Sequence, residues 1–185
     1  MSNTREKLTI STVASHWLIA IAMIGMVGFG LYIADLPRSP TKGWLIGIHK
    51  TIGLAILLLA LFRLFMRSKN PFPDHVGNYT PREATLSRIV RIFLVLAMFL
   101  LPFSGMMMTF GGGYPLPVFG LFTIGPFEKV ELLSELGHIG HELGGKLLIA
   151  AILLHVAGAL KHHIIDKDDT IKRMTGKKVE LRDKA

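Results

Sequence analysis

The sequence predicts an all-α membrane protein, a bundle of four helices that each span the bilayer. Half of the 185 residues are hydrophobic and the mean hydropathy is +0.46, more apolar than a typical soluble domain of this length. Four apolar runs each reach about 20 residues, the length that crosses about 30 Å of hydrocarbon. We expect helices over residues 12–34, 45–67, 87–110 and 137–165, within one domain that comprises residues 1–185.

The segments that join these runs have the composition of loops. The first run is too long for a signal-peptide core and no small-residue cleavage site follows it, so we expect a retained helix. Prolines break the chain after the first run and again around His75, between the second and third runs. Segment 111–127 is rich in Gly and Pro yet apolar, so we expect it to fold back on the membrane surface or over the mouth of the bundle. Residues 166–185 form a charged tail.

The basic residues predict the orientation of the chain. If the four helices alternate in direction, 16 of the 21 Lys and Arg residues fall on one side of the membrane, together with both termini. The positive-inside rule therefore places both termini in the cytoplasm. The net charge of +8 is split over three segments by the helices, which argues against nucleic-acid binding. The 16 residues are Arg5, Lys7, Arg63, Arg67, Lys69, Arg82, Arg88, Arg91, Lys161, Lys167, Lys172, Arg173, Lys177, Lys178, Arg182 and Lys184.

Four histidines inside the predicted helices form two candidate sites. His141 and His155 are fourteen residues apart, which on a helix is about 1400° of rotation, within about 40° of the same direction, and about 21 Å of rise. Because the helices alternate in direction, His16 lies near the depth of His155, and His49 lies near the depth of His141. Ionisable residues within membrane helices are costly and are usually functional. We expect two stacked pairs of imidazoles, each pair drawn from two helices.

Paired imidazoles across a helix bundle are typical of bis-histidine haem ligation. A zinc site would usually need three or four ligands, with carboxylates or cysteines among them. The chain has no cysteine, which excludes disulfides, iron–sulfur clusters, thiolate-ligated haem and covalent c-type haem. We therefore predict two b haems. His16 and His155 would ligate the iron on the cytoplasmic side, and His49 and His141 the iron on the periplasmic side.

Other residues near these sites have weaker or simpler interpretations. Arg63 lies fourteen residues after His49 and is a candidate partner for the haem propionates on the cytoplasmic side, with Lys50 a weaker candidate for the other haem. His138 is the nearest rival to His141. The four histidines could instead be polar contacts between helices. Five glycines could give a haem room against the helices: Gly25, Gly28, Gly53, Gly145 and Gly158.

The chain resembles the small bacterial cytochrome b561 family of four-helix, di-haem membrane proteins. The resemblance rests on SHWL with His16, on GIHKTIG with His49, and on GHELGGKLLIAAILLH with His141 and His155. The string ALKHHIIDKDDTIKRM near the C-terminus is the most specific match. The resemblance extends from the first helix to Met174, and it implies that the four histidines are the axial ligands in the two pairs above.

The resemblance also implies what the protein exchanges electrons with. Members of this family exchange electrons with the quinone pool, with ubiquinone or another quinone as substrate, and one branch oxidises periplasmic superoxide. By this likeness, a quinone site at the cytoplasmic end would involve His162. The predicted periplasmic side is poor in Lys and Arg and contains Glu128, Glu131 and Glu135, which favours a periplasmic redox partner or isoprenoid carrier over superoxide.

Two other functions remain open. The chain could be the cytochrome b subunit of a larger redox complex such as a hydrogenase or formate dehydrogenase, although such subunits are usually longer. It could also be a haem-free metal or proton transporter that uses the histidines as a relay. A tightly bound large subunit would indicate the first alternative, and the absence of a b-type absorption spectrum would indicate the second.

Overall fold

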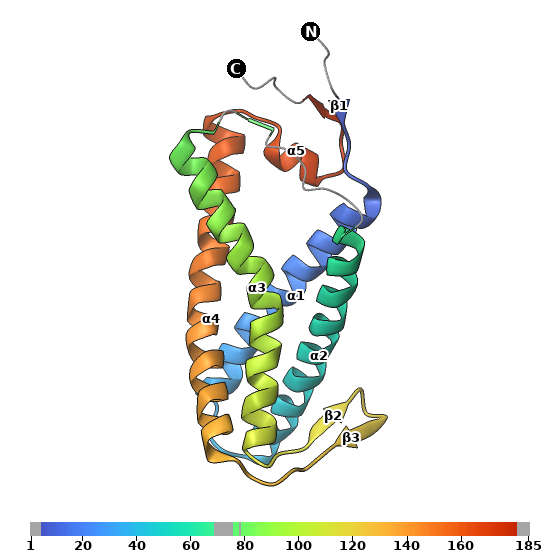
Figure 1. Ribbon diagram of the computed structural model, residues 1–185, viewed down its shortest axis with the longest axis vertical. Helices are drawn as coiled ribbons and strands as arrows, with labels where there is room; N and C mark the ends of the chain where they lie inside the picture. Colours follow the sequence, from blue (N-terminus) through green and yellow to red (C-terminus); the bar gives the residue numbers. More distant parts are fainter. Residues whose placement is uncertain (1–4, 69–75, 78, 181–185) are drawn as a thin grey trace.

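Four long helices form the body of the molecule. The computed structural model describes residues 5–68, 76–77 and 79–180 of the 185-residue chain. The helices are α1 (Ile10–Asp35), α2 (Pro40–Ser68), α3 (Pro81–Gly111) and α4 (Glu131–Leu160) (Figure 1). Each belongs to a segment long and apolar enough to cross a membrane, so the predicted four-helix membrane bundle is confirmed. Four residues considered in the sequence lie outside the described part: Lys69, His75, Arg182 and Lys184.

Three of the helices begin several residues earlier than their apolar runs. Helix α2 begins at Pro40, a residue that suits the first helical position because its missing N–H would have no partner there. Helix α3 begins after Thr80, whose side chain forms a reciprocal capping box with Glu83. Helix α4 begins at Glu131, where an acidic side chain favours the positive end of the helix dipole. Hydrophobicity marks the membrane-spanning part of a helix and misses its polar first turns.

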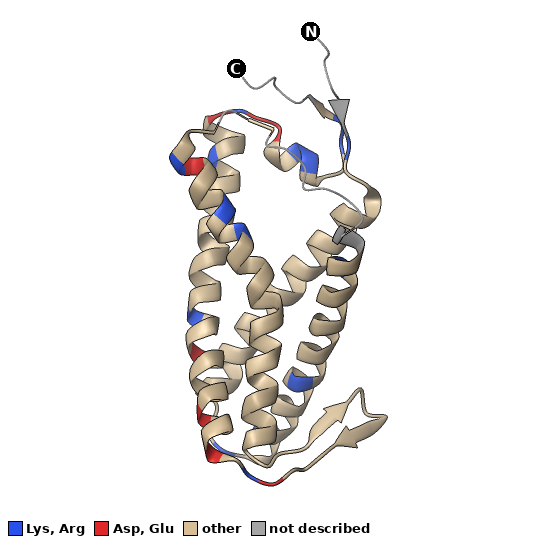
Figure 2. Ribbon diagram, in the orientation of Figure 1, with Lys and Arg blue, Asp and Glu red and all other residues tan. Residues whose placement is uncertain are grey.

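The two ends of the described chain lie together at one end of the bundle. Strand β1 (Arg5–Glu6) pairs antiparallel with β4 (Val179–Glu180). We call this the termini end. Most Lys and Arg residues lie toward it, whereas acidic residues lie at both ends, and those at the opposite end cluster around the start of α4 (Figure 2).

The described part of the charged tail, residues 166–180, is folded, which the sequence did not predict. Helix α4 continues into one π-helical turn, η1 (Lys161–Ile165), and then into the short helix α5 (Thr170–Met174). The indole N–H of Trp17 donates a hydrogen bond to the carbonyl of Met174 (2.8 Å), so α5 is held against the start of α1. Trp17 therefore ties the C-terminal segment to the first helix.

A β-hairpin lies at the other end of the bundle, which we call the hairpin end. Strand β2 (Leu116–Val118) pairs antiparallel with β3 (Phe122–Ile124). Leu116 and Val118 are buried, whereas all of β3 is exposed, so the hairpin packs through β2. It leans along the flank of α2 (Figure 1).

The closest helix packing joins α3 to α4 through glycine. A Cβ atom at Gly137 would collide with the backbone nitrogen of Met108 and would come within 2.8 Å of the carbonyl oxygen of Ser104. A Cβ atom at Gly111 would collide in the same way with the backbone of Ser134. Small residues at such crossings let two membrane helices approach until their backbones touch. The position of α4 relative to α3 is therefore fixed by the missing side chains.

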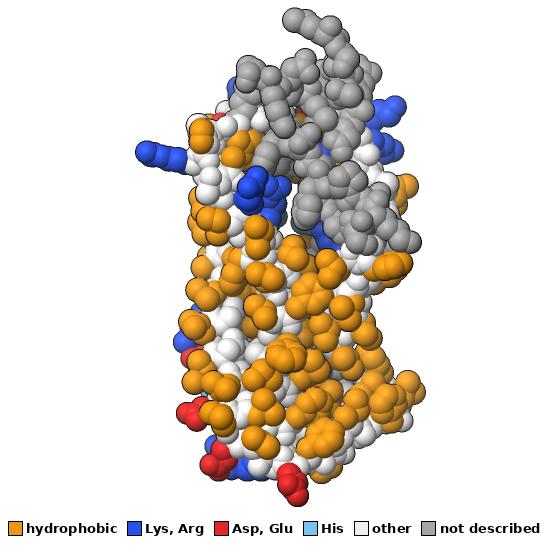
Figure 3. Space-filling view, viewed as in Figure 1, with side chains coloured by type: hydrophobic (Ala, Val, Ile, Leu, Met, Phe, Trp, Pro, Cys, Tyr) orange, Lys and Arg blue, Asp and Glu red, His pale blue; other side chains and the backbone are white. Residues whose placement is uncertain are grey.

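The buried core is small and the outer surface is apolar. Large hydrophobic side chains cover the face of the bundle shown in Figure 3, as expected where lipid is the solvent. The buried cluster at the centre consists of Ile19, Met23, Ile56, Ala60, Ala97, Met98 and Leu148.

We expect Gly137→Ala to destabilise the bundle by about 1–3 kcal/mol, because the added methyl group must push α3 and α4 apart. Gly43→Ala is the matched control, since a Cβ atom there meets nothing within 4 Å. It should be neutral or should stabilise α2 by about 0.5–1 kcal/mol. Thermal unfolding of both variants in the same detergent measures the difference. Equal melting temperatures would contradict the glycine contact.

Candidate functional site

The structure brings the four histidines together in the two pairs that the sequence predicts. The ring centroids of His16 on α1 and His155 on α4 are 6.3 Å apart, with an angle of 56° between the ring planes. The ring centroids of His49 on α2 and His141 on α4 are 6.1 Å apart, with an angle of 76°. The first pair lies toward the termini end and the second toward the hairpin end. Helix α4 contributes one imidazole to each pair.

These separations fit one metal ion between the two rings of each pair. Imidazole nitrogens bind metal ions at about 2.0–2.1 Å. In a five-membered ring with bonds of about 1.33 Å, each nitrogen lies about 1.1 Å from the centroid. Two imidazoles on opposite sides of one ion would therefore have their centroids about 6.3 Å apart. The observed distances of 6.3 and 6.1 Å agree with this value.

Hydrogen bonds from α3 set the orientation of the His141 ring. Its Nδ1 lies 3.0 Å from the carbonyl oxygen of Leu101 and 3.2 Å from the hydroxyl of Ser104. The Ser104 hydroxyl is itself within 2.9 Å of the Leu101 carbonyl, to which it donates. An Nδ1–H that donates to a backbone carbonyl leaves Nε2 with a free lone pair, which is the usual arrangement of a metal-ligating histidine. His141 is therefore prepared for ligation through Nε2.

Glycines on neighbouring helices make room for the two rings at the hairpin end. A Cβ atom at Gly30 on α1 would lie 3.2 Å from Cε1 of His49, and one at Gly105 on α3 would lie 3.3 Å from Cε1 of His141. The His49 ring also packs against Phe29, with centroids 5.8 Å apart. Because the buried Nδ1 of His49 has no hydrogen-bond partner among the described residues, packing is what holds this ring.

An apolar layer separates the two pairs. Leu148 lies seven residues from both His141 and His155, so it points in nearly the same direction from α4 at half the depth. Leu148 is 2% exposed and packs in the central cluster with Ile19 and Met23 of α1. The molecule therefore contains two separate histidine sites with a buried apolar layer between them.

Arg63 lies at the level of the pair nearer the termini end, as its spacing predicts. Its Nη1 donates a hydrogen bond to the hydroxyl of Ser15, next to His16 (3.4 Å). Lys50 is directed differently. Its ammonium donates to the carbonyl of Pro115 (3.2 Å) and lies 5.6 Å from the centroid of the Tyr114 ring, so it binds the segment before β2.

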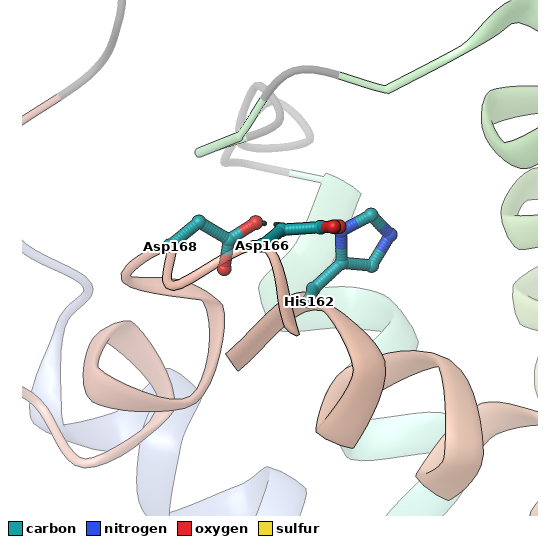
Figure 4. A group of neighbouring side chains, drawn as sticks. All are labelled: His162, Asp166 and Asp168. Atoms are coloured by element: carbon teal, nitrogen blue, oxygen red, sulfur yellow. Dashed lines mark ion pairs between the residues drawn. The ribbon is translucent and has the colours of Figure 1, made fainter. Parts of the chain in front are cut away.

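His162 is buried in a polar cluster where η1 meets the loop before α3. The residue is 6% exposed, and its ring stacks on Tyr79 with centroids 4.0 Å apart. Its Nδ1 lies 2.8 Å from Oδ2 of Asp166 and 3.4 Å from Oδ2 of Asp168 (Figure 4). Nε2 points away from both carboxylates (Figure 4). Burial raises the pKa of the Tyr79 phenol, which therefore stays neutral at physiological pH.

The same cluster has the composition of a cation site but already contains a cation. The nearest ligand atoms of His162, Asp166 and Asp168 all lie within 4.8 Å of one another. However, the ammonium of Lys161 lies 2.7 Å from the same Asp166 oxygen and also bonds Glu83. A divalent ion would have to displace this lysine, so we assign the cluster to the support of His162.

His138 is not drawn into the site. Its ring lies at the surface, with Nδ1 3.2 Å from the sulfur of Met108 and Nε2 4.0 Å from Glu142. His163 is also exposed. Neither residue contributes to a histidine pair.

Sequence reasoning missed several residues that support the four imidazoles. Gly30 lies fourteen residues after His16 and so shares its face of α1, a spacing that could have marked it. Leu101 and Ser104 gave no such signal, because their contacts with His141 depend on how α3 packs on α4. The glycines proposed from the sequence to make room for a haem do not contact the imidazoles: Gly25, Gly28, Gly145 and Gly158 have open space where a Cβ atom would lie, and at Gly53 it would lie 4.0 Å from Met26. Their role beside a haem stays a prediction.

Comparison with known proteins identifies the family. Residues 7–177 match the family model of the prokaryotic cytochrome b561. The chain belongs to the prokaryotic cytochrome b561 family. It is 33% identical over 181 residues to cytochrome b561 homolog 2 of Escherichia coli K12, covering 95% of each chain. It is 28% identical over 173 residues to the probable superoxide oxidase CybB of Yersinia pestis, covering 94% of this chain and 98% of that protein.

Membership of the cytochrome b561 family supports the coarse functional prediction. The family implies a b-type haem as cofactor and electron transfer across the membrane as the activity. Together with the four apolar helices, it makes the chain a multi-pass bacterial membrane protein. The paired imidazoles are the residues of this chain that fit such a cofactor.

We expect Gly30→Leu to lower the haem content of the purified cytochrome by about half, because the new side chain enters the space of the His49 ring in a close-packed interior. Gly28→Leu is the matched control, since Gly28 lies two residues away on α1 and a Cβ atom there meets nothing within 4 Å. A pyridine haemochrome assay measures haem per chain. Full haem content in Gly30→Leu would show that the His49 ring does not bind haem in this position.

Proposed function

We propose that this chain carries electrons across the bacterial inner membrane through two b haems, one in each histidine pair. The observation that carries the proposal is the presence of two imidazole pairs with ligation-compatible separations, about 21 Å apart along α4. When bound, the haems would supply reversible one-electron redox chemistry, and the protein would supply their position and environment.

Charge supports an orientation with the termini end in the cytoplasm. Lys and Arg residues concentrate at that end of the bundle (Figure 2), and cytoplasmic loops of membrane proteins carry the excess of these residues. In this orientation His16 and His155 form the cytoplasmic site, and His49 and His141 form the periplasmic site.

Each group of side chains has a defined task in this proposal. The four imidazoles hold the haems, and the layer around Leu148 excludes water between them. Arg63, beside Ser15 and His16, would neutralise a propionate of the cytoplasmic haem.

The cytoplasmic substrate in this proposal is a quinone, with His162 at its site. A quinone takes up two electrons and two protons to become a quinol, so its site needs a side chain that can donate and accept a proton, and an imidazole has a nitrogen for each role. The carboxylates of Asp166 and Asp168 lie beside Nδ1, which leaves Nε2 directed away from them to face a substrate (Figure 4).

The periplasmic donor or acceptor would be a redox protein or an isoprenoid carrier. Just before α4, Lys129 is paired with Glu131 (2.9 Å), and within α4 Lys146 is paired with Glu142 (2.6 Å), which weakens any attraction for a small anion. Superoxide is a second candidate, favoured by the Yersinia relative described as a probable superoxide oxidase.

The first experiment is a reduced-minus-oxidised spectrum of the purified protein, followed by quinol and superoxide as reductants. A b-type α-band and rapid reduction by quinol are expected. Absence of the band would leave the transporter interpretation, and a large subunit that remains bound through purification would favour the subunit of a larger complex.

We expect the histidine variants to lose haem in pairs. Replacing His16 or His155 with Ala should remove the same haem, and replacing His49 or His141 should remove the other, because each iron needs both of its axial ligands. Redox titration of the α-band in each variant resolves which component is lost. His138→Ala, on the same helix as His141, is the control and should keep both haems. The assignment would be overturned if variants from different pairs, such as His16→Ala and His49→Ala, removed the same haem.

We expect Arg63→Gln to lower the midpoint potential of one haem by on the order of 30–60 mV, equivalent to about 1 kcal/mol for one electron, because a positive charge nearby favours the reduced state. Lys146→Gln removes the same charge from a side chain that is exposed and paired with Glu142, so it should change neither potential measurably. Equal effects of the two variants would rule out a local contact between Arg63 and the haem.

A further inference from the structure

The hairpin between α3 and α4 carries an exposed apolar surface that the electron-transfer function does not use. Segment 111–127, which contains both strands, has no charged residue. Leu121 at the turn is 81% exposed. The other large exposed side chains of the segment are Tyr114, Phe119, Phe122, Ile124 and Phe127. Such a surface in water would promote aggregation, so it should have a partner.

The hairpin docks well inside the length of α2. Thr51 donates from Oγ1 to the carbonyl of Pro117 (3.2 Å), and Gly47 lies where a Cβ atom would be 3.7 Å from the Pro117 ring. Thr51 is eleven residues from the start of α2, about 16 Å along a helix whose 29 residues span about 43 Å. That full length matches the about 40–45 Å of a bilayer with its headgroups. The hairpin therefore reaches the depth of the acyl chains when α2 spans the membrane.

Hydrogen bonds within the protein satisfy the backbone of the hairpin between its strands, at its turn and on the side that faces α2. Strands β2 and β3 bond each other, and the amide of Leu121 closes the turn by donating to the carbonyl of Val118 (2.9 Å). On the side of β2 that faces α2, the carbonyls of Pro115 and Pro117 accept from Lys50 and Thr51. The β2 side of the hairpin therefore meets the requirement that non-helical backbone at membrane depth packs on protein.

We propose that the hairpin is inserted into the lipid leaflet at the hairpin end, with β2 against α2 and the turn from Phe119 to Phe122 among the acyl chains. The apolar surface of the spanning helices continues onto the hairpin without a break (Figure 3), so the lipid that surrounds the bundle also covers the hairpin. A water-soluble partner could cover this surface only if the surface lay outside the part of the molecule that lipid surrounds.

The inserted hairpin would brace α2 on the side opposite the histidine site. Gly47 and Thr51, one turn apart, face the hairpin, whereas His49 is about 200° around the helix from each of them. The hairpin packs on the lipid side of α2, and His49 projects from the opposite side of the helix toward His141. The bilayer thus contributes to the position of one axial ligand.

Because the natural chain has no cysteine, a single introduced cysteine can carry a spin or bimane label. We would label Leu121→Cys at the turn, Leu153→Cys on the exposed surface of α4 within its membrane-spanning segment, and Glu128→Cys at the hairpin end, all in haem-loaded protein in liposomes. Lipids that carry a nitroxide on the acyl chain should quench bimane at 121 about threefold or more above the quenching at 128, approaching that at 153, because only a buried label meets acyl chains.

Spin-label accessibility gives an independent readout of the same question. The label at 121, like the label at 153, should be more accessible to oxygen than to a water-soluble nickel complex. The label at 128 should be more accessible to the nickel complex. Lipid quenching at 121 no stronger than at 128 would overturn the proposal. The proposal would also be overturned if the label at 121 were inaccessible to the nickel complex and Leu121→Cys formed a crosslink to a second copy of the chain. A dimer contact would then cover the surface. Neither result depends on which quinone or donor the protein uses.

Discussion

The contact between α3 and α4 through Gly111 and Gly137 is the constraint on which the rest of the structure depends. Backbones that touch leave α4 no freedom to slide or rotate on α3. His141 follows Gly137 by one turn, so the same contact places its Nδ1 on the carbonyl of Leu101. Fourteen residues further along this fixed helix, His155 faces the same way. Helix α4 is therefore held in a fixed position and contributes one imidazole to each site.

The other two imidazoles, His16 on α1 and His49 on α2, face the histidines of α4. Helices α1 and α2 approach α4 less closely than α3 does. The ring centroids of each pair stay 6.3 and 6.1 Å apart, the separation that one ion between two imidazoles requires, and Leu148 lies at the level between the pairs. Lipid covers the outer surface, so hydrophobic burial against water does little to hold α1 and α2 in place within the membrane. Specific contacts do so instead: Trp17 to Met174, Arg63 to Ser15, and Thr51 to Pro117.

The parts that follow from periodicity were predictable, and the parts that follow from tertiary packing were not. The spacing of His141 and His155, with alternating helix directions, is enough to choose His155 for His16 and His141 for His49, because a helix converts sequence distance into depth and direction. The early starts of α2, α3 and α4 were missed because capping turns are polar. The bond of His141 to Leu101, the fold of the tail over Trp17 and the docking of the hairpin on α2 were missed because each joins segments distant in sequence.

The central claim is that one chain holds two haems, each between two imidazoles, with α4 common to both. The most direct test is haem quantification of the purified wild-type protein combined with near-infrared magnetic circular dichroism, which reports the axial ligands of low-spin ferric haem. The expected result is two haems per chain, both with bis-histidine ligation. One haem per chain, or a signal from methionine or a single histidine as axial ligand, would contradict it.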